Sequence, residues 1–385
     1  MKLRDYIIFA LLGICLCGCE YEFPLEGLDN GSKLYVQCIA GNSERTLINV
    51  QKAVGVNSTG GNYLPDVESI TLKVNGREYP VEKYILPEPP QDDSYLETKT
   101  SPPELILDED AYEYSILKQY NLWYTDAPIK EGDDVSLQVK AKGMEEVAAT
   151  VEVPQKVVIQ EIKAAPRCTT VTSFDNTYTD TYMSFDISLA NVSPDGYYGL
   201  VIAYDVNSTY EYSNGHTESH SYKSYSRPIV WEGGTGMIDD IQESQGDWID
   251  SYYNKYFIDS YSREGMKLIT GNCLENGHLT FDCYIPFSSE TYSDTYDYDD
   301  EIGQLVISGQ VHVINEARYQ LNIYRVSPEF FRFNKAQYLM RSNYLAELGL
   351  SPSTFSYTNL KGGFGVLGAL TCSSTPWILS PAGPE

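Results

Sequence analysis

The stretch that decides the fold runs from Asp134 to Pro154 and reads Asp-Val-Ser-Leu-Gln-Val-Lys-Ala-Lys-Gly-Met-Glu-Glu-Val-Ala-Ala-Thr-Val-Glu-Val-Pro. Apolar residues occupy alternate positions on both sides of a Lys142-Gly143 turn: Val135, Leu137 and Val139, then Val147, Ala149, Val151 and Val153. Successive side chains of a strand point to opposite faces, so this period of two predicts a β-hairpin with one buried face. Pro154 ends the second strand because proline has no backbone N–H to donate.

The same period recurs on the N-terminal side of this hairpin. Leu34, Val36 and Cys38 alternate with other residues, and an Asn75-Gly76 turn separates two further alternating runs. Short strands with turn signals and no long helical period predict an Ig-like β-sandwich over residues 32–154. We expect this sandwich to be a domain with its own core, ending at Pro154.

Residues 155–385 are predicted to form a larger β-rich domain with one or two short helices. Ser327-Pro328-Glu329 is typical of a helix start, with a capping serine and a proline in the first turn. A weaker helix pattern covers residues 239–256. The expected strands are 182–189, 197–204, the arms around Asn214-Gly215, and a pair formed by 305–313 and 317–326.

The string Gly363-Phe-Gly-Val-Leu-Gly368 fits the G-x-G-x-x-G pattern of dinucleotide sites. That site needs a helix directly after the glycines, with an acidic residue about 20 positions on. Here Ala369-Leu-Thr-Cys372 follows, which continues a strand pattern. We therefore predict that these glycines serve bends and close backbone packing.

The N-terminus has the pattern of a lipoprotein signal peptide. Lys2 and Arg4 precede an apolar run that ends in Leu16-Cys-Gly-Cys19. The run is too short to span a bilayer, and a leucine three residues and a glycine one residue before a cysteine suit cleavage there. We expect residues 1–18 to be removed, Cys19 to be lipidated, and residues 19–31 to form a tether. The alternative is an ordinary secretory signal.

Composition limits the partners of the chain. Its formal charge of -27 disfavours nucleic acid and anionic headgroups. Tyrosine is abundant, at 33 residues against 12 phenylalanines, and tyrosine suits both sheets and contact surfaces. Tyr292, Tyr296 and Tyr298, in an expected loop, are the candidate ligand or partner contacts. The alternative is that these tyrosines only pack strands together.

A candidate metal site follows the Asn214-Gly215 turn. A strand there places His216, Glu218 and His220 on one face, and two imidazoles with one carboxylate can bind a divalent metal. The alternative is that these three side chains only form the solvent-exposed face of a hairpin. No G-x-S-x-G or other nucleophile motif occurs, so no enzyme activity is predicted.

The cysteine spacing leaves one disulfide bond undecided. Cys273 and Cys283 are close enough in sequence to close a small loop, but an Asn276-Gly277 hairpin turn would set Cys273 opposite Thr280 instead. No C-x-x-C spacing occurs.

Several segments together resemble a known family. They are Lys33-Leu-Tyr-Val, Glu131–Val139, Ala149–Pro154, Pro194–Tyr198, Ser327–Arg332 and, most specifically, Tyr357-Thr-Asn-Leu-Lys-Gly-Gly-Phe-Gly-Val-Leu-Gly-Ala369. With the lipoprotein signal, they resemble the Bacteroidota outer-membrane lipoproteins grouped as domain of unknown function 4249. The resemblance implies an accessory lipoprotein of a TonB-dependent uptake complex. It implies no catalytic residues and no particular ligand.

We therefore predict a mainly β, outer-membrane lipoprotein, anchored through Cys19 and facing outward. It is expected to bind a solute or a receptor as the accessory partner of a TonB-dependent nutrient uptake receptor. The alternatives are a structural or adhesive surface lipoprotein and a metal-binding surface protein. No cofactor is predicted apart from the divalent metal, and no nucleic acid.

Overall fold

The computed structural model describes residues 33–41, 45–53, 64–85, 120–173, 176–212, 215–226, 228–229, 266–274, 276–283, 290–299, 304–342 and 357–380. Within these ranges the protein is mainly β, as the sequence predicts, with one α-helix. The predicted signal peptide, the tether, Cys19 and the weaker helix expected at 239–256 lie outside the described residues.

The strands of the N-terminal part are β1 (Lys33–Ala40), β2 (Thr46–Ala53), β3 (Val67–Val74), β4 (Arg77–Tyr79), β5 (Glu82–Lys83), β6 (Leu122–Thr125), β7 (Asp134–Ala141) and β8 (Val147–Glu152). Those that follow are β9 (Val158–Ser173), β10 (Asn176–Ala190), β11 (Tyr197–Tyr212), β12 (Thr217–Ser226), β13 (Pro228–Ile229), β14 (Lys267–Thr270), β15 (His278–Cys283), β16 (Glu290–Asp299), β17 (Gln304–Val326), β18 (Phe364–Ser374) and β19 (Ile378–Leu379). The helix is α3 (Pro328–Ser342).

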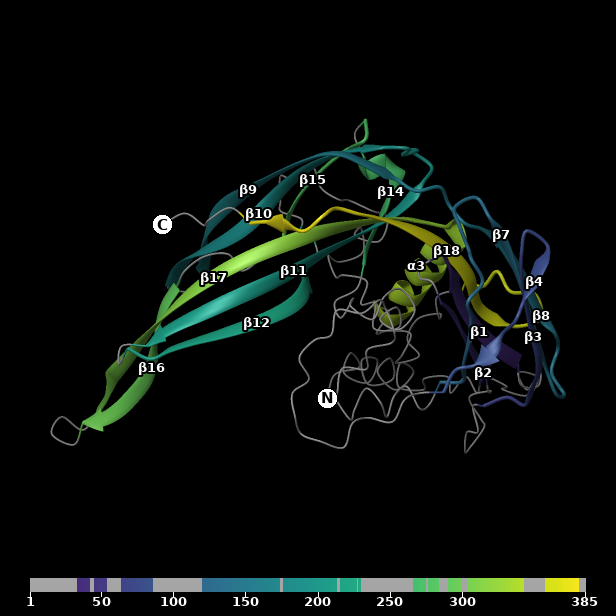
Figure 1. Ribbon diagram of the computed structural model, residues 1–385, viewed down its shortest axis with the longest axis horizontal. Helices are drawn as coiled ribbons and strands as arrows, with labels where there is room; N and C mark the ends of the chain where they lie inside the picture. Colours follow the sequence, from purple (N-terminus) through teal and green to yellow (C-terminus); the bar gives the residue numbers. More distant parts are fainter. Residues whose placement is uncertain are drawn as a thin grey trace, which may run out of the picture.

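These strands form an arch. An 11-stranded sheet with the order β12-β11-β17-β18-β1-β2-β6-β5 runs its length, with β14, β16 and β19 paired off this path. Two four-stranded sheets, β4-β3-β7-β8 and β13-β15-β10-β9, pack against its two ends. Figure 1 shows β9 and β10 over the outer side of the arch and α3 on its inner side.

The first sandwich has an aliphatic core between β3, β7 and β8 on one side and β1, β2 and β18 on the other. Its hairpins turn where the sequence predicts. Asn75 and Gly76 have φ values of 50° and 79°, and Gly143 has a φ of 72°, which are left-handed conformations that asparagine and glycine adopt at low cost. The immunoglobulin-like connectivity stays a prediction.

The second sandwich has an aromatic core. Phe185 and Phe281 of the smaller sheet stack with ring centroids 5.2 Å apart, and Tyr319 of β17 meets Phe185 edge-on at 5.0 Å. Its strands are long, at 15 residues for β10 and 16 for β11. The hairpin predicted at Gly215 joins β11 to β12.

One sheet joins the two sandwiches, although each sandwich has its own core, and the domain boundary at Pro154 stays a prediction. Strand β18 lies parallel to β1 and antiparallel to β17, and Leu367 and Ala369 lie in the first core. The glycines of β18 permit this approach: Gly365 has a φ of +107°, and a Cβ there would meet the Val36 carbonyl. The prediction of strand and close packing for the glycine string is thus confirmed.

Helix α3 begins where the sequence predicts. The Phe330 amide donates to the Ser327 hydroxyl at 3.3 Å, which caps the first turn, and the Ser327 amide donates to the Ala369 carbonyl of β18 at 2.8 Å. Phe330, Phe331 and Phe333 are buried in a third apolar cluster on the inner side of the arch. Within the described ranges, no helix combines the length and apolar character that crossing a membrane requires.

Three local expectations are corrected. Residues 305–313 and 317–326 are not a strand pair but parts of the single strand β17, because Asn315 and Glu316 stay paired with β11 instead of turning. Residues 292–298 are not a loop but part of β16, whose backbone pairs with β17. The hairpin around Asn276-Gly277 is absent, because β14 pairs with β11 in the large sheet whereas β15 pairs with β10 in a smaller one.

Candidate functional site

The inner face of β1 and β2, opposite the first core, carries the candidate site. Leu34, Val36 and Cys38 point into the aliphatic core, so the alternate residues of β1 point to the side that holds α3. Most of β1 is buried on both faces, because α3 and its neighbours cover the second one. The side chains on this covered face include two amides and several tyrosines.

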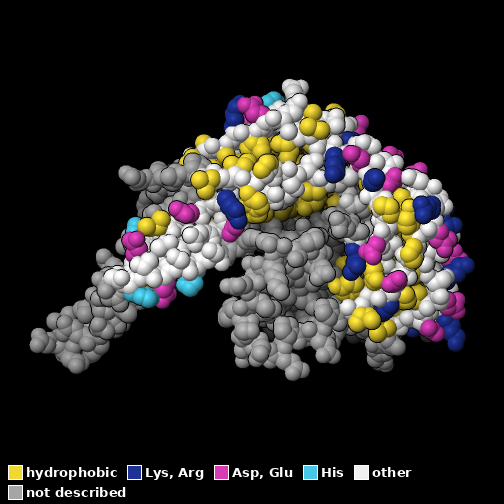
Figure 2. Space-filling model, viewed as in Figure 1, with side chains coloured by type: hydrophobic (Ala, Val, Ile, Leu, Met, Phe, Trp, Pro, Cys, Tyr) yellow, Lys and Arg dark blue, Asp and Glu magenta, His cyan; other side chains and the backbone are white. Residues whose placement is uncertain are grey.

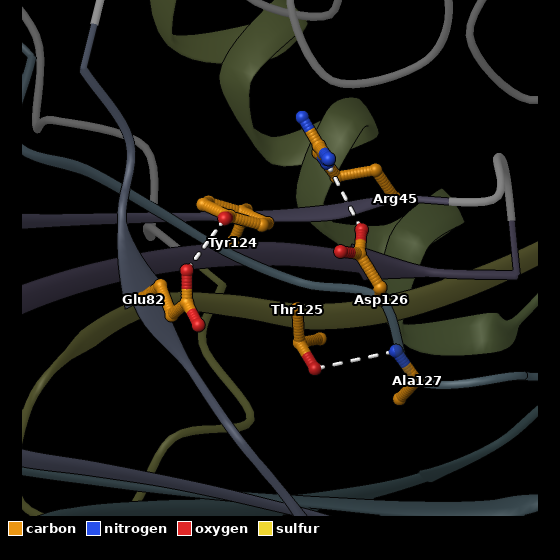
Figure 3. Close-up of polar contacts among 6 residues, drawn as sticks. All are labelled: Arg45, Glu82, Tyr124, Thr125, Asp126 and Ala127. Carbon is orange, nitrogen blue, oxygen red and sulfur yellow. Dashed lines mark hydrogen bonds and ion pairs between the residues drawn. The ribbon is translucent and has the colours of Figure 1, made fainter.

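The exposed end of the face is a cluster that we name the Tyr124 patch: Arg45, Glu82, Tyr84, Tyr124 and Asp126. The Arg45 guanidinium lies 4.3 Å from the centre of the Tyr124 ring and donates to Asp126 Oδ1 at 3.0 Å. The Tyr124 hydroxyl donates to Glu82 Oε2 at 2.7 Å, and the Tyr84 ring meets Tyr124 edge-on at 6.1 Å. Figure 3 shows the contact of Tyr124 with Glu82 and that of Arg45 with Asp126 as dashed lines.

The register of three strands builds this patch. Glu82 of β5 is directly opposite Tyr124 of β6, and Tyr124 is opposite Leu47 of β2. Arg45 and Asp126 stand just beyond the paired ends of β2 and β6, where Thr46 is opposite Thr125. The patch therefore needs the whole β2-β6-β5 edge of the long sheet.

The charges of the patch are fixed by its contacts. The hydrogen bond to Asp126 raises the pKa of Arg45, and the hydrogen bond to Glu82 raises the pKa of Tyr124, so the guanidinium stays charged and the phenol stays neutral. The Arg45 and Asp126 side chains are 45% and 62% exposed, so water screens their ion pair, which stabilises the fold by at most about 1 kcal/mol. Its effect is to orient the side chains.

The buried part of the face holds a second arrangement, the amide pair Gln37 and Asn49. The two residues are directly opposite on β1 and β2, and they are 1% and 0% exposed. Gln37 Nε2, Asn49 Nδ2 and Asn49 Oδ1 have no hydrogen-bond partner. The Tyr35 hydroxyl donates to Gln37 Oε1 at 3.5 Å, a long contact. Each unsatisfied buried polar atom costs about 1–3 kcal/mol.

The structure brings together the three residues of the predicted metal site. Glu218 accepts from His216 Nε2 at 2.8 Å, and its other oxygen lies 3.5 Å from His220 Nε2. Hydrogen bonds from His216 and His220 lower the pKa of Glu218. All three side chains are exposed, and Figure 2 shows histidines near the end of the arch that carries β12. Across the described residues, no three His, Cys, Asp or Glu side chains are arranged to hold a metal, and a metal site at these residues stays a prediction.

The side chains of the other predicted contacts, Tyr292, Tyr296 and Tyr298, lie outside what the structure describes. Their role as contacts stays a prediction. Cys283 is a buried thiol in the second core, and the side chain of Cys273 lies outside the described residues.

Sequence reasoning missed the Tyr124 patch and the amide pair. The patch joins residues from positions 45, 82, 84, 124 and 126, and only the β2-β6-β5 pairing brings them together. One signal was available: the segment Lys33–Ala40 has no charged residue after Lys33, so neither of its faces reads as solvent-exposed.

The fold defines a class: a mainly β protein in which one long sheet serves two sandwiches and presents a tyrosine-, arginine- and amide-bearing face beside its helix. The chain belongs to the family described as domain of unknown function (DUF4249), whose model matches residues 20–375. A search of curated proteins and a search of solved structures returned no significant match.

Proposed function

We propose that the protein is a lipid-anchored accessory component of an outer-membrane uptake complex, which contacts a TonB-dependent receptor through the Tyr124 patch. Cys19 carries the lipid, and the folded body faces outward. The protein performs no covalent chemistry in this role. The expected partner follows from the family resemblance, and the patch supplies the contact surface.

The observation that carries the proposal is the construction of the Tyr124 patch. Tyrosine and arginine are the side chains that most often dominate binding energy at protein interfaces. Here Arg45 and Tyr124 are held by Asp126, Glu82 and each other, so less side-chain entropy remains to be lost on binding. Beside Tyr84, Ile85 is 84% exposed, which adds apolar surface to the same edge.

The surface around the patch fits a protein partner rather than a lipid surface. Figure 2 shows acidic and basic side chains interspersed over the first sandwich. The net charge of -27 repels anionic headgroups, so the lipid at Cys19 provides the membrane attachment in this proposal. Tyr292, Tyr296 and Tyr298 of strand β16 are a second candidate contact surface.

The test is co-purification of the lipoprotein from detergent-solubilised outer membranes, with wild type and the double variant Arg45→Ala/Tyr124→Ala. We expect a receptor barrel in stoichiometric amount with wild type and at least about tenfold less with the variant, since loss of two central contact residues typically costs more than 1.4 kcal/mol. Thermal melts of both proteins show whether the variant is folded.

A matched control exists at the far end of the long sheet. Arg318 forms the same kind of cluster: it donates to Asp205 at 2.6 Å and lies 5.2 Å from the centre of the Trp377 ring. Arg318→Ala should leave receptor recovery unchanged. Recovery of fibres or adhesion ligands instead of a barrel would support the structural or adhesive alternative. Equal recovery of the receptor barrel with wild type and the double variant would show that the Tyr124 patch is not the contact surface. Tyr292, Tyr296 and Tyr298 would then be the next residues to substitute.

A further inference from the structure

The amide pair lies in a row of four side chains that crosses the long sheet on its inner face. Parallel pairing puts Val366 beside Gln37, antiparallel pairing puts Asn49 beside Gln37, and Leu122 lies beside Asn49. Val366 and Leu122 belong to the apolar cluster that includes the phenylalanines of α3. Two amides therefore stand inside an otherwise apolar strip.

The amide pair contrasts with the half-buried side chain of Asn359. Most buried polar atoms in proteins are hydrogen-bonded, and both polar atoms of the Asn359 side chain follow that rule. Asn359 Nδ2 donates to the Leu367 carbonyl at 2.9 Å and its Oδ1 accepts from the Leu367 amide at 3.1 Å. Of the seven buried, partnerless side-chain nitrogen and oxygen atoms in the described part of the chain, three belong to Gln37 and Asn49.

We propose that the amide pair is the binding site of a neutral, hydroxylated ligand of the carbohydrate or polyol class. This inference rests on the proposed uptake function, because it names the kind of solute that the accessory protein would hold for the receptor. Gln37 Nε2 and Asn49 Nδ2 need acceptors, and Asn49 Oδ1 needs a donor. Two adjacent hydroxyls meet all three needs, since each hydroxyl donates and accepts.

The ligand is neutral because the strand register sets uncharged side chains beside the amide pair. These are Val366 and Leu122 in the same row and Tyr35 and Gln51 in the next one. A ligand charge placed on the amide pair would lose its water without gaining an opposite charge, which is costly in an apolar strip.

A peptide fits this strip less well than a polyol. An extended peptide brings one donor and one acceptor per residue, and each needs a partner once it is buried. Strands β1 and β2 are interior strands of the sheet, so they have no free edge to pair with a peptide backbone. In the row itself the amides are flanked by the apolar side chains of Val366 and Leu122, which offer a peptide backbone no hydrogen bond.

The approach to the pair is from the Tyr35 end. Tyr35 and Gln51, the next cross-strand pair on this face, are half-buried, whereas Gln37 and Asn49 are closed to solvent. A ligand reaches the amides by displacing the side chains packed over them. That displacement exposes atoms that have no partner in the closed state, so it breaks no hydrogen bond of Asn49.

The test uses detergent-solubilised, full-length lipoprotein on an array of neutral oligosaccharides, followed by calorimetric titration of the best binder. The variants are Asn49→Leu and Gln37→Met. We expect the dissociation constant to rise about fivefold to tenfold for each lost hydrogen bond. The melting temperature should stay the same or increase, because the amides have no protein partner to lose apart from the long contact between the Tyr35 hydroxyl and Gln37 Oε1.

Asn359→Leu is the matched control. It removes two satisfied hydrogen bonds and should lower the melting temperature. A decrease of similar size in the melting temperature of Asn49→Leu would show a structural role and overturn the inference. Failure of the wild-type protein to bind any neutral glycan on the array would overturn it as well. Binding of neutral peptides that is lost in Asn49→Leu would show that the ligand is not a carbohydrate.

Receptor co-purification is measured on the same variants. Normal receptor recovery without glycan binding refutes this inference alone, whereas absence of the receptor from the wild-type preparation refutes the proposed function.

Discussion

The two sandwiches share one sheet but fill their cores with different side chains. The buried positions of the first core are aliphatic or cysteine, whereas those of the second include Tyr198, Phe185, Phe281 and Tyr319. The strands differ as well: those of the first sandwich are mostly 6–8 residues long, and β17 of the second has 23. Rings fill more volume per residue, and tyrosines add hydroxyls that need partners. The first core therefore depends on shape alone, and the second on shape and hydrogen bonding.

The largest expected effect concerns two buried thiols, one in each core. Burial raises the pKa of Cys38 to about 12, from 9.0, so its reactive thiolate is about a thousandfold rarer than in the unfolded chain. Cys283 is fully buried in the second core. Because β18 joins both sandwiches, we expect the two thiols to become reactive together as urea is added. Alkylation followed by peptide mass mapping measures this.

Loss of protection at Cys283 well before Cys38, or the reverse, would show that the sandwiches open separately. It would then support the boundary at Pro154 that the sequence suggests. Cys372, which is only partly buried, serves as the control for labelling without global unfolding.

The next effect compares one side chain from each core. Phe185→Ala removes a ring that contacts Phe281 and Tyr319, and should lower the free energy of unfolding by about 4 kcal/mol. Leu137→Ala leaves a smaller cavity in the aliphatic core and should cost about 3 kcal/mol. Urea denaturation followed by circular dichroism measures both. If the two variants shift two different transitions instead of one, the shared sheet does not couple the cores.

The smallest effect isolates hydrogen bonding in the second core. The Tyr198 hydroxyl accepts from the Ser193 amide at 2.7 Å and lies 3.3 Å from the Ser193 carbonyl, which holds the turn before β11. Tyr198→Phe keeps the ring and should lower the free energy of unfolding by about 1–2 kcal/mol. The first core, whose buried side chains are aliphatic or cysteine, offers no equivalent substitution. A melting temperature equal to that of wild type would show that water replaces the lost contact.

The parts of the fold that follow from local sequence were predictable. The turns at Asn75-Gly76 and Gly143 and the start of α3 at Ser327 depend on residues within a few positions of one another. The parallel pairing of β1 with β18 joins residues more than 300 positions apart, and no local pattern encodes such a register. For that reason the sheet that the two sandwiches share could not be predicted from the sequence.

The candidate site was predictable only in part. The alternation after Gly215 correctly places His216, Glu218 and His220 on one face. The tyrosines at 292–298 read as a loop because acidic residues interrupt them, yet the backbone pairing with β17 makes a strand there. The burial of Gln37 and Asn49 could not be predicted, because α3 and its neighbours, which are distant in sequence, cover them.

The position of β1 also determines how mechanical force applied at the lipid anchor would be transmitted to the folded body. Residues 19–32 separate the predicted lipid at Cys19 from Lys33, the first residue of β1, and extended chain reaches at most roughly 50 Å over that length. Strand β1 has β2 on one side and β18 on the other, so tension arriving at Lys33 shears two ladders of hydrogen bonds at once. Such a load spreads into both sandwiches instead of peeling away an edge strand.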